Sequence, residues 1–293
     1  MASDRASLER QPSNRLRAAL RARAPPHGRS VTAGTPRAKG AVWPIGQRSS
    51  SGRSLLRNAS PATFVSVGFT IALFDIDGTL LRAGGAGRRA LDLALVEVLG
   101  GPDEVSFASV EFAGRTDPWI VAEGLAKHGV EADVGLIEEV LRRYLAHLPA
   151  QLELASTFEV LPGAMELLTG LVARDDLALG LGTGNTEPAA YAKLARGGLD
   201  SFFSFGGFGS DHPERAELLR VGLHRGLQQA ANGREARAVV IGDTPHDVRA
   251  ARAIGADCIA VSTGGYDAKA LEAAGAELVV SDLRAPEVLR VFG

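Results

Sequence analysis

The chain has 293 residues, of which 45% are hydrophobic, so it is long enough for two domains with buried cores. Its formal net charge is −2, and its single cysteine, Cys258, excludes an internal disulfide and a zinc site built from several thiolates. No apolar run is long enough for a transmembrane helix, so we expect no membrane partner. The low cysteine content favours a cytoplasmic protein.

The first 66 residues differ in composition from the rest. They carry 12 Lys and Arg against 2 Asp and Glu, whereas residues 67–293 carry 20 against 32. Residues 1–66 show no sustained apolar periodicity, so they bury too little surface to offset the entropy of ordering, and we expect a disordered basic extension. Three interpretations of this extension remain open: a transit peptide, an inert tail or misassigned start near Val67, or a basic arm that binds nucleic acid or a membrane. The arm interpretation lacks interleaved aromatic residues and a lysine cluster, so we expect no nucleic-acid partner.

Beyond this extension, short apolar runs alternate with amphipathic stretches. The runs predict strands over Thr70–Phe74, Leu177–Leu181, Phe202–Phe205, Ala238–Ile241, Asp257–Val261 and Glu277–Val280. The amphipathic stretches predict helices over Gly163–Ala173, Pro188–Gly197, Arg215–Ala231, His246–Ile254 and Ala268–Ala274. This alternation predicts an α/β fold, with a Rossmann-like, mostly parallel sheet covered by helices on both faces.

Residues 88–158 interrupt the alternation. They predict helices over Arg88–Leu99, Pro118–His128 and Leu136–Leu154, with no convincing strand between them. Glycine and proline at 83–87 and 160–163 suit hinges on either side. We therefore expect residues 67–87 and 159–293 to form the core domain, and residues 88–158 to form an inserted helical domain.

Two carboxylates follow the first predicted strand. Asp75 and Asp77 are two residues apart, so on an extended chain both side chains point the same way. Gly78 lets the backbone turn sharply behind them. The pattern places a nucleophile and an acid/base at the carboxyl end of a strand, where open α/β sheets bind ligands.

Polar residues also follow two later predicted strands. Thr183-Gly184-Asn185 offers a hydroxyl and backbone N–H groups that suit a phosphate oxygen. Asp243 and Asp247 offer hard oxygen ligands that suit Mg²⁺. Between these motifs, Arg215 begins a predicted helix and offers a cation.

In this order the motifs resemble those of the haloacid dehalogenase superfamily of phosphatases, and the likeness covers residues 69–293. The resemblance implies that Asp75 is the nucleophile, Asp77 the general acid/base, and Thr183 a phosphate-binding residue. It also implies that Mg²⁺ is bound by Asp75, the backbone carbonyl of Asp77 and Asp243, with Asp247 beside them. The inserted helices would then be a cap.

The phosphate-binding cation departs from the usual superfamily pattern. That cation is usually a lysine followed by proline, whereas here Arg215 is followed by Ala216. Arginine can hold a phosphate through two parallel hydrogen bonds, so the role is chemically compatible. Lys193 is the alternative, although we expect it on a solvated helix face.

The segment 113–118 resembles a cap loop of phosphoglycolate phosphatase-like members. By this resemblance, Arg115 reaches the substrate when the cap closes. The same residues also suit a helix start, with Thr116 or Asp117 as the N-cap and Pro118 in the first turn. Both interpretations can hold together.

The second carboxylate distinguishes the possible reactions. A leaving alkoxide needs a proton and a leaving halide does not, so Asp77 favours phosphate esters over haloacids. We predict Mg²⁺-dependent hydrolysis of a small phosphate monoester through an aspartyl-phosphate, with a phosphoglycolate phosphatase-like substrate. A β-phosphoglucomutase-like phosphomutase and a non-catalytic binding protein are the alternatives. The expected partner is a small phosphorylated metabolite, and the sequence leaves open a monomer or a homodimer.

Overall fold

The computed structural model describes residues 68–100, 105–229 and 236–293. The predicted disordered extension, residues 1–66, lies outside this part of the chain. Within the described ranges, no helix is both long and apolar enough to cross a membrane.

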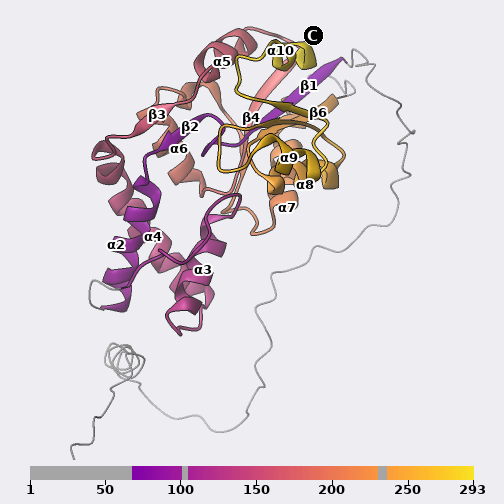
Figure 1. Ribbon diagram of the computed structural model, residues 1–293. Coiled ribbons are helices and arrows are strands. Elements are labelled where there is room, and N and C mark those ends of the chain that lie inside the picture. The colour runs from indigo at the N-terminus through magenta and orange to yellow at the C-terminus, as the bar shows by residue number, and fades with distance from the viewer. Residues whose placement is uncertain (1–67, 101–104, 230–235) are drawn as a thin grey trace, which may run out of the picture. The chain divides into compact units, whose positions relative to one another are not determined.

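A six-stranded sheet forms the centre of the fold (Figure 1). Its strands are β1 Phe69–Phe74, β4 Leu177–Thr183, β5 Gly206–Phe208, β6 Ala236–Gly242, β7 Asp257–Val261 and β8 Leu278–Val280. They lie in the order β5-β4-β1-β6-β7-β8, and every neighbouring pair is parallel. The predicted α/β fold with a mostly parallel sheet is therefore confirmed.

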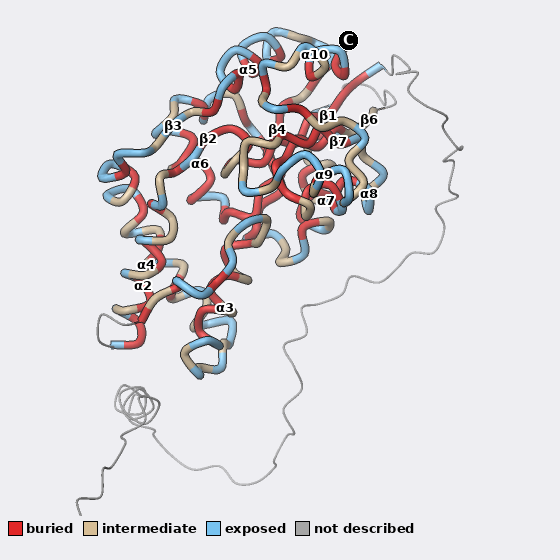
Figure 2. Tube along the Cα trace, in the orientation of Figure 1, coloured by how far each residue is buried: buried red, intermediate tan, exposed pale blue. Residues whose placement is uncertain are grey.

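Strand β1 lies between β4 and β6 and is buried along its whole length, as the red tube in Figure 2 shows. A strand covered on both faces needs apolar residues at successive positions, and Phe69–Phe74 supplies this run. Alternate residues of the strand, such as Ile71 and Leu73, pack on the side of the sheet that is covered by α7, α8 and α9.

Helices follow most strands. They are α5 Ala164–Val172, α6 Glu187–Arg196, α7 Arg215–Leu227, α8 Pro245–Ile254, α9 Ala268–Ala273 and α10 Pro286–Phe292. In Figure 1, α7, α8 and α9 lie together, and α5 and α10 lie together elsewhere around the sheet. The helix α10 was not predicted from the sequence.

The predicted strand Phe202–Phe205 is wrong, because the structure has a short 3₁₀ helix at Asp200–Phe202 and places β5 at Gly206–Phe208. The physical reason is the close approach of α7 to β5. A Cβ on Gly207 would lie 1.8 Å from the carbonyl oxygen of Leu218, so only glycine fits this strand position. The Phe205 ring instead fills the space beside Gly180.

The segment 86–153 contains helices α2 Ala86–Leu99, α3 Asp117–Lys127 and α4 Val134–Glu153, and no strand among its described residues. Two short strands that were not predicted, β2 Leu81–Ala83 and β3 Phe158–Val160, pair antiparallel at its two junctions. Thus part of each predicted hinge belongs to a two-stranded ribbon. Because Ser66–Gly293 forms a single compact unit, the division into a core and an inserted domain stays a prediction.

Candidate active site

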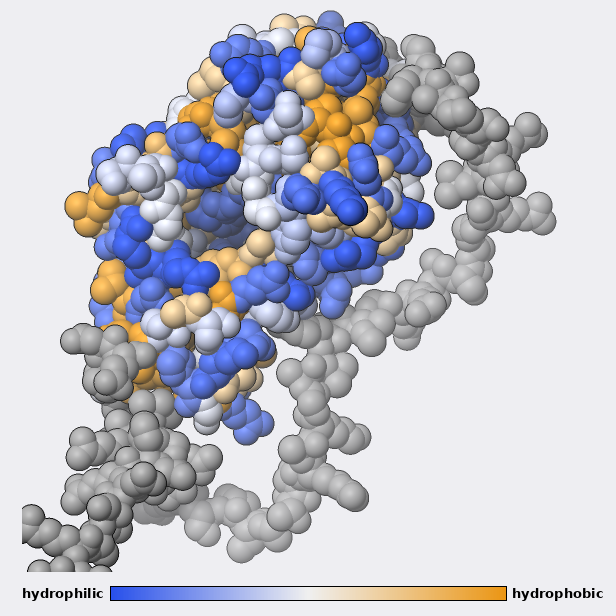
Figure 3. All heavy atoms as spheres, in the orientation of Figure 1, coloured by the Kyte–Doolittle hydropathy of each residue, from blue (hydrophilic) through white to orange (hydrophobic). Residues whose placement is uncertain are grey.

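The candidate site lies at the carboxyl ends of β1, β4 and β6. A cavity of about 520 Å³ opens there, with walls from the loops after these strands, from residues 87–88 and from residues 112–120. Figure 3 shows a recess in this face of the molecule with hydrophilic side chains on its walls. Asp75, Asp77, Thr183, Asp243 and Arg215 all line the cavity, so the structure brings the predicted motifs together.

The turn after β1 depends on glycine. Gly78 has a φ of 88°, and a Cβ at this position would lie 2.4 Å from a carboxylate oxygen of Asp243. The carbonyl oxygen of Ile76 accepts hydrogen bonds from the backbone N–H groups of residues 79, 80 and 81, and these bonds close the turn. This turn brings β1 and the loop after β6 into contact, so the carboxylates of both loops meet.

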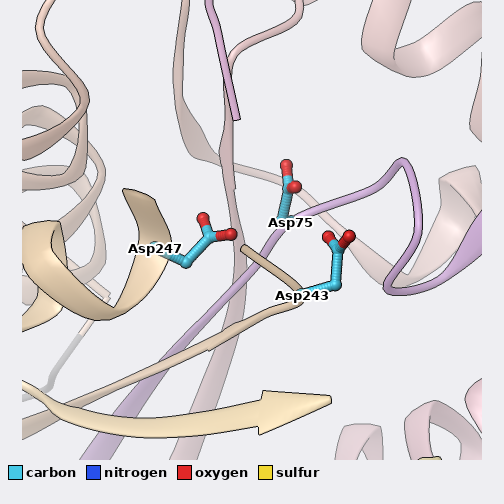
Figure 4. Close-up of side chains that lie close together, drawn as sticks. All are labelled: Asp75, Asp243 and Asp247. Atoms are coloured by element: carbon cyan, nitrogen blue, oxygen red, sulfur yellow. The ribbon is translucent and has the colours of Figure 1, made fainter. Parts of the chain in front are cut away.

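Three buried carboxylates form a cluster in this region: Asp75, Asp243 and Asp247 each offer an oxygen within 4.8 Å of the others. In Figure 4 the Asp75 and Asp243 carboxylates lie side by side, and Asp247 approaches from α8. Burial raises the pKa of Asp75 to about 6, and the nearby negative charges of Asp247 and Asp77 act in the same direction. Burial, together with Asp75 and Asp247, also raises the pKa of Asp243.

Arg215 is the buried cation next to this cluster. Its Nη2 lies 3.0 Å from Asp75 Oδ1, and its Nε donates to Asp247 Oδ1 at 2.6 Å. The other oxygen of Asp247 accepts hydrogen bonds from the backbone N–H and the hydroxyl of Thr244 in a capping box that begins α8. Both oxygens of Asp247 are therefore engaged by protein donors.

The donor set fits a small divalent cation such as Mg²⁺, which prefers carboxylate and carbonyl oxygens. Thr79 donates a hydrogen bond to one oxygen of Asp243, at 3.2 Å. A cation between Asp75 and Asp243 would favour their ionised forms against the burial that raises both pKa values. The Asp77 side chain is not part of the cluster, in keeping with the predicted use of its backbone carbonyl.

The residues after β4 form a hydrogen-bonded chain with Asp77. The amide nitrogen of Asn185 donates to Thr183 Oγ1 at 2.8 Å and to Asp77 Oδ2 at 2.9 Å. Lys193 Nζ donates to Asp77 Oδ2 and to Asn185 Oδ1, both at 2.6 Å. The side chain of Lys193 is only 7% exposed, so the expectation of a solvated helix face is wrong. A partner 116 residues away in the sequence determines its position, which helical spacing could not predict.

The loop before α3 contacts the loop after β4. The backbone N–H of Asp117 donates to the Gly184 carbonyl at 2.8 Å, and its carboxylate accepts from the backbone N–H of Thr186 at 2.8 Å. Asp117 thus caps the start of a neighbouring helix, α6. Of the two predicted caps of α3, Thr116 and Asp117, the structure places Thr116 at the N-cap, where it makes no side-chain cap bond. A Cβ on Gly184 would lie 2.1 Å from the Arg115 carbonyl oxygen, so this contact requires glycine.

Arg115, which we expect by resemblance to reach the substrate, lines the cavity. Its guanidinium lies 4.3 Å from the ring centre of Trp119, and the nearest oxygen of Glu111 is 3.9 Å away. Its Nε is buried and has no hydrogen-bond partner among the residues that the structure describes. An unpaired buried donor is unfavourable, so this guanidinium has capacity for an anion.

Comparison with known proteins gives the family. The sequence model of the haloacid dehalogenase-like hydrolases matches residues 69–255. A phosphoglycolate phosphatase of Rhodospirillum rubrum is 32% identical over 220 residues, which cover 72% of this chain and 86% of that protein. A phosphoglycolate phosphatase of Pseudomonas putida is 28% identical over 73% of this chain and 77% of that protein. The chain therefore belongs to the haloacid dehalogenase-like hydrolase family.

Solved structures share this fold. A predicted phosphatase from Clostridium acetobutylicum superimposes with a TM-score of 0.59 at 18% identity, over 78% of this chain and 99% of that chain. At this level of identity the similarity establishes the fold, and the activity has to be argued from the site.

Proposed function

We propose that the protein is a Mg²⁺-dependent phosphatase that hydrolyses a small phosphate monoester, such as 2-phosphoglycolate, through an aspartyl-phosphate on Asp75. The observation that carries this proposal is the pairing of Asp75 and Asp77 in one turn at the cavity, with Arg215 and Thr183 beside them. The two phosphoglycolate phosphatases described above support the choice of substrate. The cytoplasmic location stays a prediction.

Two displacements make up the reaction. In the first, a carboxylate oxygen of Asp75 attacks phosphorus, the bond from phosphorus to the ester oxygen breaks, and Asp77 gives its proton to the departing alkoxide. In the second, water attacks phosphorus, the bond to Asp75 breaks, and Asp77 takes the proton of the water. Inorganic phosphate and an alcohol are the products, and both aspartates return to their starting states.

The remaining polar residues would bind and orient the phosphoryl group. Thr183, backbone N–H groups at Gly184 and Asn185, and the Arg215 guanidinium would donate to its oxygens as charge redistributes. Asp247 would act by holding Arg215, because both of its oxygens already accept hydrogen bonds.

The proposed metal ligands are Asp75, Asp243 and the backbone carbonyl of Asp77. A bound Mg²⁺ would offset the repulsion between the Asp75 carboxylate and the dianionic phosphate. The three carbonyl and carboxylate groups are hard oxygen donors, and two of them already lie in one cluster.

The substrate preference rests on Arg115. Its unpaired Nε could hold a carboxylate at the far end of a short substrate, as in 2-phosphoglycolate. In this proposal the helices α2 to α4 act as a cap that closes over the cavity, and the loop with Arg115 and Asp117 is one of its contacts with the core.

A β-phosphoglucomutase-like reaction is the second candidate. A protein provisionally named β-phosphoglucomutase from Bacteroides vulgatus shares the fold, with a TM-score of 0.53 at 20% identity. A mutase would need further cap donors for a sugar phosphate. Arg88 lines the cavity, but its guanidinium already donates to the carbonyls of Phe107 and Val110. The observed contacts therefore favour the hydrolase.

The test is Mg²⁺-dependent phosphate release from 2-phosphoglycolate and from hexose phosphates. We expect release with 2-phosphoglycolate, and we expect Asp75→Asn to lower kcat by at least ~1,000-fold while the fold stays intact. Undiminished release by Asp75→Asn would contradict the covalent mechanism. Conversion of a hexose 1-phosphate to the 6-phosphate without net phosphate release would instead indicate the mutase.

A further inference from the structure

The cavity wall contains a lysine that the proposed reaction does not use. Lys193 lies on α6, its Nζ donates to Asp77 Oδ2 and to Asn185 Oδ1 at 2.6 Å each, and only 7% of its side chain is exposed. Burying an ammonium group is unfavourable unless it is well paired, so its position requires an explanation.

The contacts of Lys193 argue against a role in binding phosphate. Two carboxylates, Asp77 and Asp117, lie near its ammonium group, and their charges outweigh the effect of burial so that the pKa of Lys193 is raised. The side chain is also enclosed by the helical segment, since Lys193 Nζ and the Tyr144 hydroxyl both lie within 3.8 Å of where a Cβ on Gly87 would be. Its positive charge is thus already balanced by protein groups.

The same contacts fix one oxygen of Asp77. Asp77 Oδ2 accepts from both Lys193 Nζ and the Asn185 amide nitrogen, at 2.6 and 2.9 Å. With two donors on Oδ2, the other oxygen is the one that can carry a proton. We propose that Lys193 is a positioning residue that, together with Asn185, orients Asp77 so that Oδ1 delivers its proton to the leaving oxygen. This inference rests on the proposed function, and Lys193 acts through Asp77 without touching the phosphoryl group.

The chemical consequence depends on the leaving group. An alkoxide is a poor leaving group and needs the proton of Asp77, whereas p-nitrophenolate is a stabilised anion that departs without one. Loss of a positioned acid should therefore harm the reaction of an alkyl phosphate and spare that of an aryl phosphate. Loss of a phosphate-binding cation would harm both, because both substrates carry the same phosphoryl group.

The experiment compares kcat/KM for 2-phosphoglycolate and p-nitrophenyl phosphate in the full chain with Mg²⁺. We expect Lys193→Met to lower kcat/KM for 2-phosphoglycolate by ~100-fold or more, mainly through kcat, and to change that for p-nitrophenyl phosphate by less than about fivefold. Lys127→Met, at an exposed lysine on α3, is the matched control and should change neither value. Arg215→Ala should raise KM for both substrates.

Lys193→Met leaves the buried Asp117 carboxylate with one cation fewer, so the same comparison is also made in an Asp117→Asn background. In that background, the ratio of kcat/KM for 2-phosphoglycolate to kcat/KM for p-nitrophenyl phosphate in the double variant is compared with the same ratio in Asp117→Asn alone. Equal losses on both substrates, or no loss on either, with a folded protein would overturn the role of Lys193 and leave the phosphatase proposal intact. A wild-type protein that hydrolyses neither substrate would overturn the proposed function itself.

A double variant provides an independent check. If Lys193 acts through Asp77, then in an Asp77→Asn background Lys193→Met should lower kcat/KM for 2-phosphoglycolate by less than about threefold. A further loss as large as that in the wild-type background would show that the two residues act separately, and would contradict the inference.

Discussion

At the scale of single residues, the Asp75 and Asp243 carboxyl groups are two acids buried close together. Burial raises the pKa of each, with neighbouring carboxylates acting in the same direction. A fold that keeps such a pair is under electrostatic strain, which protons or a cation relieve. This is the physical basis for expecting a metal to stabilise the protein as well as to assist its chemistry.

We therefore predict that Mg²⁺ raises the melting temperature. A ligand that binds only the folded state stabilises it by about 3 kcal/mol at 100 times its Kd, which is several degrees for a protein of this size. Differential scanning fluorimetry with and without Mg²⁺ measures the shift. Asp243→Ala should abolish most of it, and an undiminished shift in that variant would argue against Asp243 as a ligand.

Asp117 gives a second prediction at this scale. Burial raises its pKa from 3.8 to about 6, against the opposing effects of Lys193 and the Thr186 N–H group. The folded state therefore binds more protons than the unfolded state between about pH 4 and 6, and the free energy of unfolding falls as the pH rises through this window. Above it, ionised Asp117 destabilises the fold by up to about 3 kcal/mol.

An asparagine at this position keeps an oxygen for the Thr186 N–H group but cannot ionise. Asp117→Asn should therefore be more stable than the wild type at pH 8, and the difference should shrink toward pH 4. Urea unfolding at both pH values measures this difference. A wild type that is more stable than Asp117→Asn at pH 8 would show that the ion pair with Lys193 outweighs burial.

At the scale of elements, the contact between β5 and α7 decides where the strand lies. The backbone of β5 lies against α7, and Gly207 has no room for a side chain next to the Leu218 carbonyl. An alanine there must push backbone away from backbone, which costs more than displacing a flexible side chain. The absence of a Cβ at Gly207 thus allows the short strand β5 to pack closely against α7, the helix that begins with Arg215.

We predict that Gly207→Ala lowers the free energy of unfolding by about 3 kcal/mol or more. Gly170→Ala is the matched control, because Gly170 lies inside helix α5 and a Cβ there meets nothing within 4 Å. That control should raise the free energy of unfolding by about 0.5 to 1 kcal/mol. Similar effects of the two substitutions in urea unfolding would contradict the packing argument.

These elements also show what the sequence could and could not predict. The strands β1 and β6, which end just before Asp75 and Asp243, and β4, which ends at Thr183, were predicted because each contains an apolar run followed by its own polar motif. The position of β5 was not, because it depends on the approach of a helix from elsewhere in the chain. The contacts of Lys193 with Asp77, and of Asp117 with Thr186, are likewise set by long-range packing that leaves no local signal.

At the scale of the whole molecule, the described elements and the proposed site are contained in residues 69–293. The first strand begins at Phe69, and the family model also begins there. All proposed ligands and catalytic residues follow this strand. The basic composition of residues 1–66 has no counterpart in the proposed chemistry, which uses only residues beyond them.

Removal of residues 1–66 should therefore leave the enzyme unchanged. We expect the shortened chain to keep its melting temperature, and its kcat/KM for 2-phosphoglycolate to stay within about twofold of the full-length value. Phosphate release and fluorimetry on the two purified chains measure this directly. A tenfold loss of kcat/KM at an unchanged melting temperature would show that the basic segment contributes to binding the anionic substrate, whereas a lower melting temperature would show that it stabilises the fold.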